Sequence, residues 1–421
     1  MESGRHPLTR AVGRSLAVLG LTAAWISAGG QPFADAITGA REPVDFARDY
    51  LAAYVRVHQG RGAAPAGEDG NTTAAAIGVP RVELLGGPYY VHPPAAQLLV
   101  LPLVPLGFRG AALAWLALSL IALGALAVML VSIATGAERP WPRHVAMAFG
   151  LMVLWPPVLH NLAKGQWSII LAALVAAGWR ALGRGHPRAA GAWLGLAASL
   201  KATPLLLLGF LVWRHRRAAA VMAATVIAAG LASVAVSGVE PWRTWLRTAG
   251  PNVLAWQTWT ANTVSLNGLF ARLLTSSAFA RPLLDAPWLA RALAGAVAVL
   301  LVAAASLACW RAPRRPAADG RLFAAWTLLV VLLNPLGWTH TATIALVPLA
   351  LLVVDRVRGS AWVLPAALAA LTIPRETLAA LAGPVPVAPG RGLVLSLHAG
   401  ALLLGLAVCL RRDRHPPAEP L

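Results

Sequence analysis

The sequence predicts an all-α polytopic membrane protein, and three observations lead to this fold class. Of the 421 residues, 58% are hydrophobic and only 12% are charged, about half the charged share of a soluble globular protein. Apolar runs approaching the ~20 residues needed to cross a bilayer recur from Leu16 to Leu410. Basic residues gather at the short breaks between these runs, as they do in membrane proteins. We therefore expect a single integral membrane domain, residues 1–421, with about 11 or 12 transmembrane or re-entrant helices.

The charge pattern predicts the orientation of this domain. The chain has 35 basic and 16 acidic residues, and 20 of the basic residues fall at the breaks between apolar runs. The positive-inside rule places these breaks and both chain ends in the cytoplasm. The outer segments are then 31–93, 238–288 and 374–392, which hold ten of the acidic residues. No basic face is separable from the spans, so no nucleic-acid partner is expected, and the high Ala, Arg and Gly content suggests a bacterial plasma membrane.

The first membrane segments follow from the need to alternate between the two sides. Segment 11–30 has a basic start and an apolar middle, and we expect an uncleaved span rather than a signal peptide, because further spans follow at once. Segment 94–135 needs an odd number of passes, which predicts a short segment from Pro94 and a full span from Ala111.

Two pairs of short helices are expected next, each turning at a polar apex. They are 145–160 with 166–179, turning at 160–166, and 189–200 with 204–213, turning at 201–204. The remaining apolar runs are 218–237, 289–310, 322–333, 341–354, 361–373 and 393–410.

The outer loop 31–93 carries the first candidate for chemistry. A helix starting near Glu42 is predicted to be amphipathic and to lie on the membrane face, with Asp45 near its start. A carboxylate there can act as a general base at the interface. The helix alone favours the simpler interpretation, in which Asp45 caps the N-terminus. The apolar positions of this helix are Phe46, Tyr50, Ala53, Tyr54 and Val57.

Polar residues also interrupt the apolar runs. The apex holding Lys164 and Gln166 is polar at a depth where polar groups usually face a cavity or a partner. Lys201 interrupts an apolar run just before Pro204, and its ammonium can bind a phosphate or pair with a carboxylate. His92 precedes two prolines at the entry to a membrane segment, which also suits a simple helix start.

Two later segments allow more than one interpretation. The outer segment 238–288 interleaves tryptophans with amides and hydroxyls, which suits sugar binding and equally suits an interfacial aromatic belt. Its polar residues include Asn262 and Arg272. The segment 334–340 is expected to be a broken helix ending at His340, which can donate to a phosphate, position an acid, or serve a structural role.

Several classes of site are excluded by the motifs. Cys309 and Cys409 both lie in apolar runs, which excludes a disulfide framework and a cysteine metal site. The sequence has no Walker loop, no glycine-rich dinucleotide fingerprint and no His-Glu-x-x-His zinc motif. A cytosolic nucleotide donor is therefore not expected, and the chemistry is expected to face outward.

The order and spacing of these motifs across residues 40–345 resemble glycosyltransferase family 87, whose members are membrane mannosyltransferases of the GT-C superfamily. The sequence departs from the family pattern at Ser168, Asn334 and Gly337, which leaves mannose as the default sugar. The matching positions are Asp45, Phe46 and Tyr50; His92, Pro93 and Pro94; Pro105 and Leu106; Gly165 and Gln166; Lys201 and Pro204; Ser265, Leu266, Gly268 and Arg272; and Pro335, Trp338 and His340.

The resemblance implies an enzyme with a GT-C type fold that moves a hexose from a polyprenyl-phosphate donor to an acceptor hydroxyl at the outer membrane face. Inversion of the sugar is implied, with Asp45 as general base and Asp49 as its nearest competitor, and neither a metal nor another cofactor is expected. The implied partners are the lipid-linked donor, a glycolipid or glycan acceptor, and membrane lipid; a protein acceptor is left open. The residues implied to hold the donor phosphate are Lys201, His340 and Arg272, and those implied to contact sugar or acceptor are Gln166, Asn262, Tyr50, His92 and Asp49.

Two functions of other classes also fit parts of the sequence. A secondary transporter or lipid-linked sugar flippase would use broken helices and mid-membrane polar residues, but would show paired halves and intramembrane carboxylates. A non-catalytic membrane scaffold would tolerate substitution at both Asp45 and Asp49.

Overall fold

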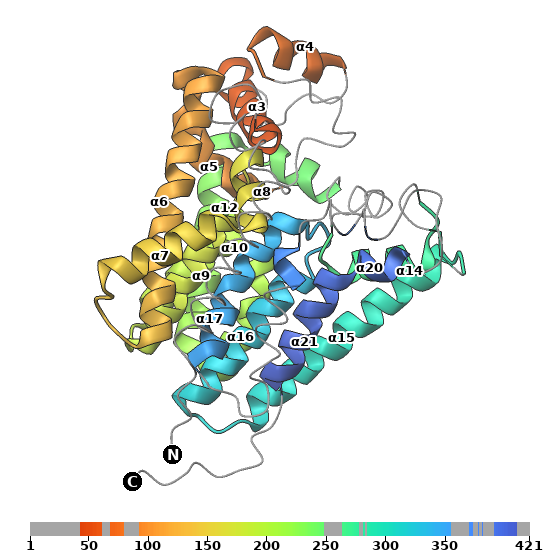
Figure 1. Ribbon diagram of the computed structural model, residues 1–421. Coiled ribbons are helices and arrows are strands. Elements are labelled where there is room, and N and C mark those ends of the chain that lie inside the picture. Colours follow the sequence, from red (N-terminus) through yellow and green to blue (C-terminus); the bar gives the residue numbers. More distant parts are fainter. Residues whose placement is uncertain are drawn as a thin grey trace, which may run out of the picture.

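The computed structural model describes residues 43–60, 68–79, 92–247, 263–277, 281–282, 284–354, 370–373, 378, 381 and 391–410. Their regular structure is helical, apart from one isolated antiparallel bridge between Thr263 and Trp338 (Figure 1). The all-α polytopic fold predicted from the sequence is confirmed. The predicted span 11–30 and most of the run 361–373 lie outside the described residues.

Among the described residues, three helical segments are long and apolar enough to cross a membrane, and a bent pair of helices makes a possible fourth. The three are Pro94–Thr135, α12 (Arg216–Ser237) and α15 (Pro287–Arg311), and the bent pair is α7 (Pro142–Val153) with α8 (Pro156–Lys164). Shorter apolar helices fill the space between them: Ser168–Gly183, Thr203–Arg214, Thr339–Leu352 and Leu397–Leu410.

The segment that begins at Pro94 is divided as predicted into a short piece and a long span. The short piece consists of η2 (Pro94–Ala96), α5 (Gln97–Val100) and η3 (Leu101–Leu106), and α6 (Gly107–Thr135) follows it. Prolines lack an amide hydrogen, so the repeated prolines favour tight 3₁₀ turns over a continuous α-helix. The long helix begins four residues before the predicted Ala111.

The run 145–160 was predicted as one helix, and this is wrong. The chain breaks at Leu154 and Trp155, and α8 is bent by 71° relative to α7. Trp155 is extended because two prolines follow it, and a residue before proline is disfavoured in the α conformation. The bend makes α8 a separate short helix, which ends at Gly165 and leads into α9 (Ser168–Gly183).

The next helices pack through small residues. α10 (Pro187–Leu200) packs against α12. In the chain these two helices are separated by η4 (Thr203–Leu206) and α11 (Leu207–Arg214), which form the second half of the second predicted pair. A Cβ atom built at Gly191 would lie 2.4 Å from the carbonyl oxygen of Ala218, so only glycine allows this approach. Close backbone packing at glycines is typical of helices in membranes.

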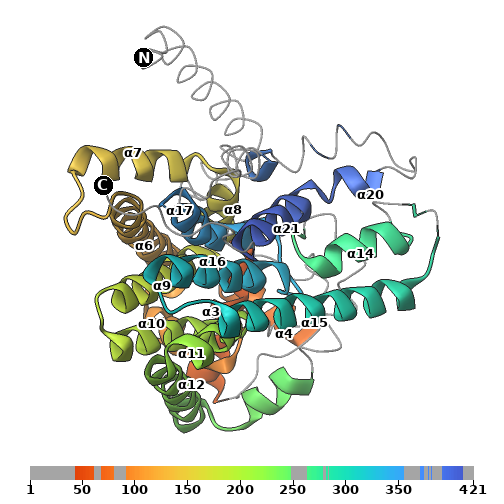
Figure 2. The ribbon, with the colours of Figure 1, turned by 90° about the horizontal axis from the view of Figure 1, so that it is seen from below.

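α16 (Pro316–Leu332) lies at the centre of the bundle (Figure 2). Its side chains from Leu322 onward are buried. It is surrounded by α11, α15, α17 (Leu346–Val354) and α21 (Leu397–Leu410). Further described elements are α3 (Val44–Gln59), α4 (Glu68–Ala76), α14 (Leu266–Leu274), η6 (Thr339–Ala345) and α20 (Arg391–Val394).

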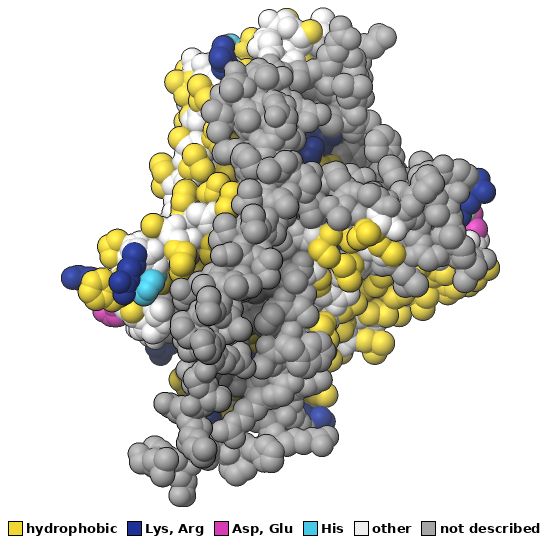
Figure 3. Space-filling model, in the orientation of Figure 1, with side chains coloured by type: hydrophobic (Ala, Val, Ile, Leu, Met, Phe, Trp, Pro, Cys, Tyr) yellow, Lys and Arg dark blue, Asp and Glu magenta, His cyan; other side chains and the backbone are white. Residues whose placement is uncertain are grey.

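Apolar side chains cover the two flanks of the molecule that α6 and α15 form in Figure 3. The exposed side chains include Leu113 and Ile121 on α6 and Val299 and Leu300 on α15. Large apolar surfaces on spanning helices are the surfaces expected to face lipid.

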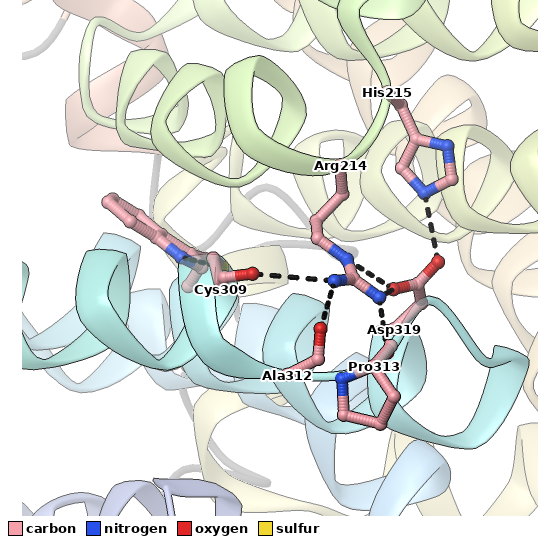
Figure 4. A network of polar contacts seen from close by, with 7 residues as sticks. Arg214, His215, Cys309, Ala312, Pro313 and Asp319 are labelled. Atoms are coloured by element: carbon pink, nitrogen blue, oxygen red, sulfur yellow. Dashed lines mark hydrogen bonds and ion pairs between the residues drawn. The ribbon is translucent and has the colours of Figure 1, made fainter.

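A buried arginine joins three helices at one end of the bundle (Figure 4). The guanidinium of Arg214, at the end of α11, donates to Asp319 Oδ1 on α16 with an Nε–Oδ1 distance of 2.6 Å. It also donates to the carbonyl oxygens of Cys309, Ala312 and Pro313 at the end of α15. The arginine side chain is only 2% exposed, so this network holds α11, α15 and α16 together.

We expect the variant Arg214→Met to lose about 3 kcal/mol of stability, because it removes one partner of a buried ion pair and leaves several carbonyl groups without donors. The measurement is the thermal midpoint of unfolding in detergent. The matched control is Arg184→Met, because Arg184 is half-exposed and lies 4.0 Å from an exposed Glu138. The control is expected to lose less than about 1 kcal/mol. Equal losses of stability in the two variants would contradict the role of Arg214 in holding α11, α15 and α16 together.

Candidate active site

The helix predicted near Glu42 is α3 (Val44–Gln59), but its surroundings differ from the prediction. Phe46, Tyr50 and Leu51 are fully buried, and α3 packs against η3, α5, α6 and α8 (Figure 1). The expectation that α3 lies with its apolar face on the membrane is therefore wrong. The actual buried face covers protein, and Val57, predicted to be part of it, is exposed.

Asp45 lies in the first turn of α3 and does not cap it. The cap position is taken by Pro43, and no side chain there forms a capping hydrogen bond, so the predicted N-cap position of Asp45 is wrong. Its carboxylate still lies in the first turn, where a negative charge complements the helix dipole. The carboxylate is 5% exposed, and its Oδ2 accepts a hydrogen bond from Gln166 Nε2 at 2.8 Å. Within the described chain no hydrogen bond reaches Oδ1 of Asp45.

Asp49 lies one turn further along α3 and has both of its oxygens occupied. Its Oδ1 is 3.1 Å from Nδ1 of His92, and its Oδ2 accepts from the indole Nε1 of Trp167 at 2.8 Å. The two neighbouring carboxylates therefore differ in how many of their oxygens accept hydrogen bonds. Asp45 keeps a free acceptor oxygen, whereas Asp49 is engaged in orienting two side chains.

The loop between α8 and α9 presents Gln166 and Trp167 to these carboxylates. Gly165 adopts a positive φ of 66°, which reverses the chain, and its carbonyl oxygen accepts from the indole of Trp115. Asn161 is fully buried, and its side chain donates to the carbonyl of Gln166 and accepts from the amide of Ile169. The loop is held on both sides, so Gln166 and Trp167 have fixed directions.

We expect the variant Gly165→Ala to be destabilised by about 1–3 kcal/mol and to lose activity. A Cβ atom at Gly165 would lie 2.6 Å from Cβ of Phe46, so α3 must move away from the loop. The matched control is Gly136→Ala, which has a similar φ of 70° but no atom within 4 Å of the added Cβ. The control shares the backbone strain and is expected to keep its activity. Thermal unfolding and transfer assays on both variants measure the difference.

Lys201 directly follows α10 and lies near the two carboxylates. It is 8% exposed, and its ammonium is attracted by Asp45 and, more weakly, by Asp49. The sequence left a phosphate contact and a carboxylate partner as alternatives, and the structure brings Lys201 close to carboxylates. The two roles are compatible, because an ammonium group has three donors.

His340, in η6, lies among further basic groups. The charges that act on it most strongly are those of Lys201 and Lys164, followed by those of His160 and His92. η6 packs against both α8 and α9, which carry or adjoin several of these residues. Basic groups from α8, α10 and η6 therefore converge next to the carboxylates of α3.

Two other predicted site residues have structural partners. Arg272 is buried and donates to the hydroxyl of Ser396 at 3.0 Å and to the carbonyl oxygen of Thr263 at 2.9 Å. Tyr50 donates its hydroxyl to the carbonyl oxygen of Val104 at 3.2 Å, and burial raises the pKa of its phenol. These contacts link helices, and the proposed roles of Arg272 and Tyr50 toward substrate stay predictions. Asn262 lies outside the described residues.

The tryptophan-rich segment gives no clear sugar platform in its described part. Trp242 donates to the hydroxyl of Ser233 on α12 and packs edge-on against Trp245. Trp288 is 67% exposed at the start of α15. These positions favour the interfacial-belt interpretation for the three tryptophans; Trp256 and Trp259 lie outside the described residues.

The structure adds contributors that the sequence did not identify. Trp167 orients Asp49, while Trp115 and Asn161 shape the loop that carries Gln166. The sequence indicated the role of Trp167 only in part. Trp167 directly follows Gln166, but a tryptophan within an apolar run is typical of an ordinary buried core. Among the described residues, no group of three or more His, Cys, Asp or Glu side chains is arranged to hold a metal ion.

Comparison with known proteins gives one match. The model of glycosyltransferase family 87 matches residues 90–335, more than half of the chain. The matched range contains His92, Gln166 and Lys201. The searches of curated proteins and of solved structures gave no match.

Proposed function

The chain belongs to glycosyltransferase family 87, and on that premise we propose that it transfers a hexose, with mannose the default, from a polyprenyl-phosphate donor to an acceptor hydroxyl at the outer face of the membrane. The family establishes the coarser statement that the protein is a membrane glycosyltransferase. The observation that carries the finer proposal is Asp45, a buried carboxylate with one oxygen held by Gln166 and the other available, beside a group of basic side chains.

Asp45 is the proposed general base. Gln166 fixes the orientation of its carboxylate, so that Oδ1 can accept the proton of the acceptor hydroxyl. The acceptor oxygen then bonds to the anomeric carbon as the bond from that carbon to the phosphate oxygen breaks, which inverts the configuration. The bonding electrons stay with the lipid phosphate, and the proton stays on Asp45.

The basic groups provide the proposed site for the departing phosphate. Lys201 and His340 come from separate elements of the membrane body. Lys201 supplies a buried ammonium group and His340 a ring N–H, and each can donate a hydrogen bond to the departing phosphate. Lys201 also offsets the charge of the two carboxylates, so one ammonium serves both the base and the leaving group.

The test is transfer by the purified protein in nanodiscs. Radiolabelled polyprenyl-phosphate mannose is supplied with a total lipid extract, and labelled products are separated from the donor. We expect a labelled glycolipid or glycan, or slow hydrolysis of the donor. Absence of turnover with several polyprenyl-phosphate sugars, by a folded protein, would contradict the proposed donor and favour the transporter alternative.

A further inference from the structure

His92 has one ring nitrogen held and the other without a partner. The side chain is 7% exposed, and its Nδ1 is 3.1 Å from the carboxylate of Asp49. The other nitrogen, Nε2, is buried and has no hydrogen-bond partner among the described residues. Buried polar atoms are nearly always hydrogen-bonded, so a buried ring nitrogen without a partner needs an explanation.

The contact with Asp49 determines which nitrogen carries a proton. A carboxylate only accepts hydrogen bonds, so Nδ1 of His92 is protonated and donates to Asp49. The two nitrogens lie on opposite edges of the imidazole ring, and Nε2 is therefore directed away from Asp49. The ring also packs against Trp167, with 5.6 Å between ring centroids, which further restricts its orientation.

The surroundings indicate what Nε2 would bind. η2, which starts two residues after His92, packs against α10, the helix that Lys201 directly follows. His92 is also among the groups near His340 that influence its ring electrostatically. Apart from the carboxylates of Asp45 and Asp49, the polar groups described around His92 are basic. A ligand that several of these basic groups can contact is an anion.

Resting on the proposed function, we propose that His92 is a further catalytic residue, which donates a hydrogen bond from Nε2–H to the phosphate of the lipid-linked donor. Asp49 is then a positioning residue. It accepts the hydrogen bond from Nδ1–H, and in the proposed complex the ring carries its second proton on Nε2, between the carboxylate and the phosphate. As the bond to the sugar breaks, negative charge grows on the phosphate, and this hydrogen bond strengthens.

Two substitutions at the same position separate the two ring nitrogens. In His92→Asn the amide lies near the position of Nδ1, so the contact with Asp49 can be kept while the Nε2 donor is lost. In His92→Gln the longer side chain brings an amide near the position of Nε2. His186→Asn is the matched control, because His186 is exposed and lies at the start of α10.

The measurement is the dissociation constant of farnesyl phosphate, which carries the lipid phosphate without a sugar, for the full chain in detergent. We expect His92→Asn to bind it about 10- to 100-fold more weakly than the wild type. His92→Gln is expected to recover part of this loss, Asp49→Asn to show a smaller loss, and His186→Asn none. Thermal unfolding of every variant identifies any that fail to fold.

Three results would overturn the proposal. If His92→Asn binds farnesyl phosphate as the wild type does but loses transfer, His92 acts on the sugar or the acceptor. If His92→Gln is folded and binds no better than His92→Asn, the Nε2 donor is not the relevant feature. If the wild type itself does not bind farnesyl phosphate, the proposed lipid-phosphate donor fails as well, which is a different outcome from a loss confined to the His92 variants.

Discussion

Replacing Asp45 with Asn is expected to reduce sugar transfer by about 10³-fold or more, because general-base catalysis contributes about 10² to 10⁴. The neighbouring carboxylate in the described part of the chain, Asp49, has both oxygens engaged. The asparagine has the same shape and can keep a carbonyl oxygen as acceptor for Gln166 Nε2, which donates to Asp45 at 2.8 Å. The fold should therefore survive. The measurement is the initial rate of transfer from polyprenyl-phosphate mannose, with thermal unfolding as the check on folding.

Asp49→Asn is the control that distinguishes the two carboxylates. Both oxygens of Asp49 already accept hydrogen bonds, from His92 and Trp167, so it is not poised to take a substrate proton. We expect its replacement to lower the rate, through loss of orientation, but by much less than replacement of Asp45. A larger loss in Asp49→Asn than in Asp45→Asn would transfer the role of base to Asp49.

Replacing Lys201 with Met is expected to reduce kcat/KM for the donor by about 10²- to 10³-fold, the cost of removing one strong electrostatic contact to a developing charge. Methionine keeps most of the apolar length of the lysine side chain, so packing is largely preserved. Removing the ammonium also leaves Asp45 and Asp49 without the cation that attracts them. The measurement is the rate of transfer as a function of donor concentration.

Lys164→Met is the matched control for the loss of Lys201. Lys164 is half-buried at the end of α8, and its charge, like that of Lys201, acts on His340. Because Lys164 is more exposed, we expect a loss of less than about 10-fold. Unchanged donor dependence in a folded Lys201→Met protein would show that the phosphate is bound elsewhere.

The helices near the site could be predicted where local chemistry dictates them. The prolines from Pro94 to Pro105 require a break before the long span α6, and the structure has this break. Lys201 was expected to interrupt a helix, and α10 ends just before it. The bend after α7 was missed because the apolar run continues through it. The two prolines at 156 and 157 are a signal of the break that hydropathy alone conceals.

The contacts that build the site could not be predicted, because they join segments far apart in the chain. Gln166 and Asp45 are 121 residues apart, and Trp167 and Asp49 are 118 residues apart. Nothing in either segment specifies the other, since both depend on how α8 and α9 pack against α3. The same applies to Arg214 and Asp319, which are 105 residues apart in the chain. Taken alone, each of these charged residues indicates only the end of a helix.

Two adjacent loop residues, Gln166 and Trp167, each hold one carboxylate of α3, and the carboxylates are four residues apart. These two contacts therefore fix the rotation of α3 about its axis. A shift of α3 by one residue would turn it by about 100° and would break both hydrogen bonds together. Gly165, pressed against Phe46, also prevents α3 from sliding inward. We therefore expect α3 to keep its position during the proposed transfer. We expect the sugar and the acceptor to move to Asp45 during turnover, while Asp45 itself stays in place.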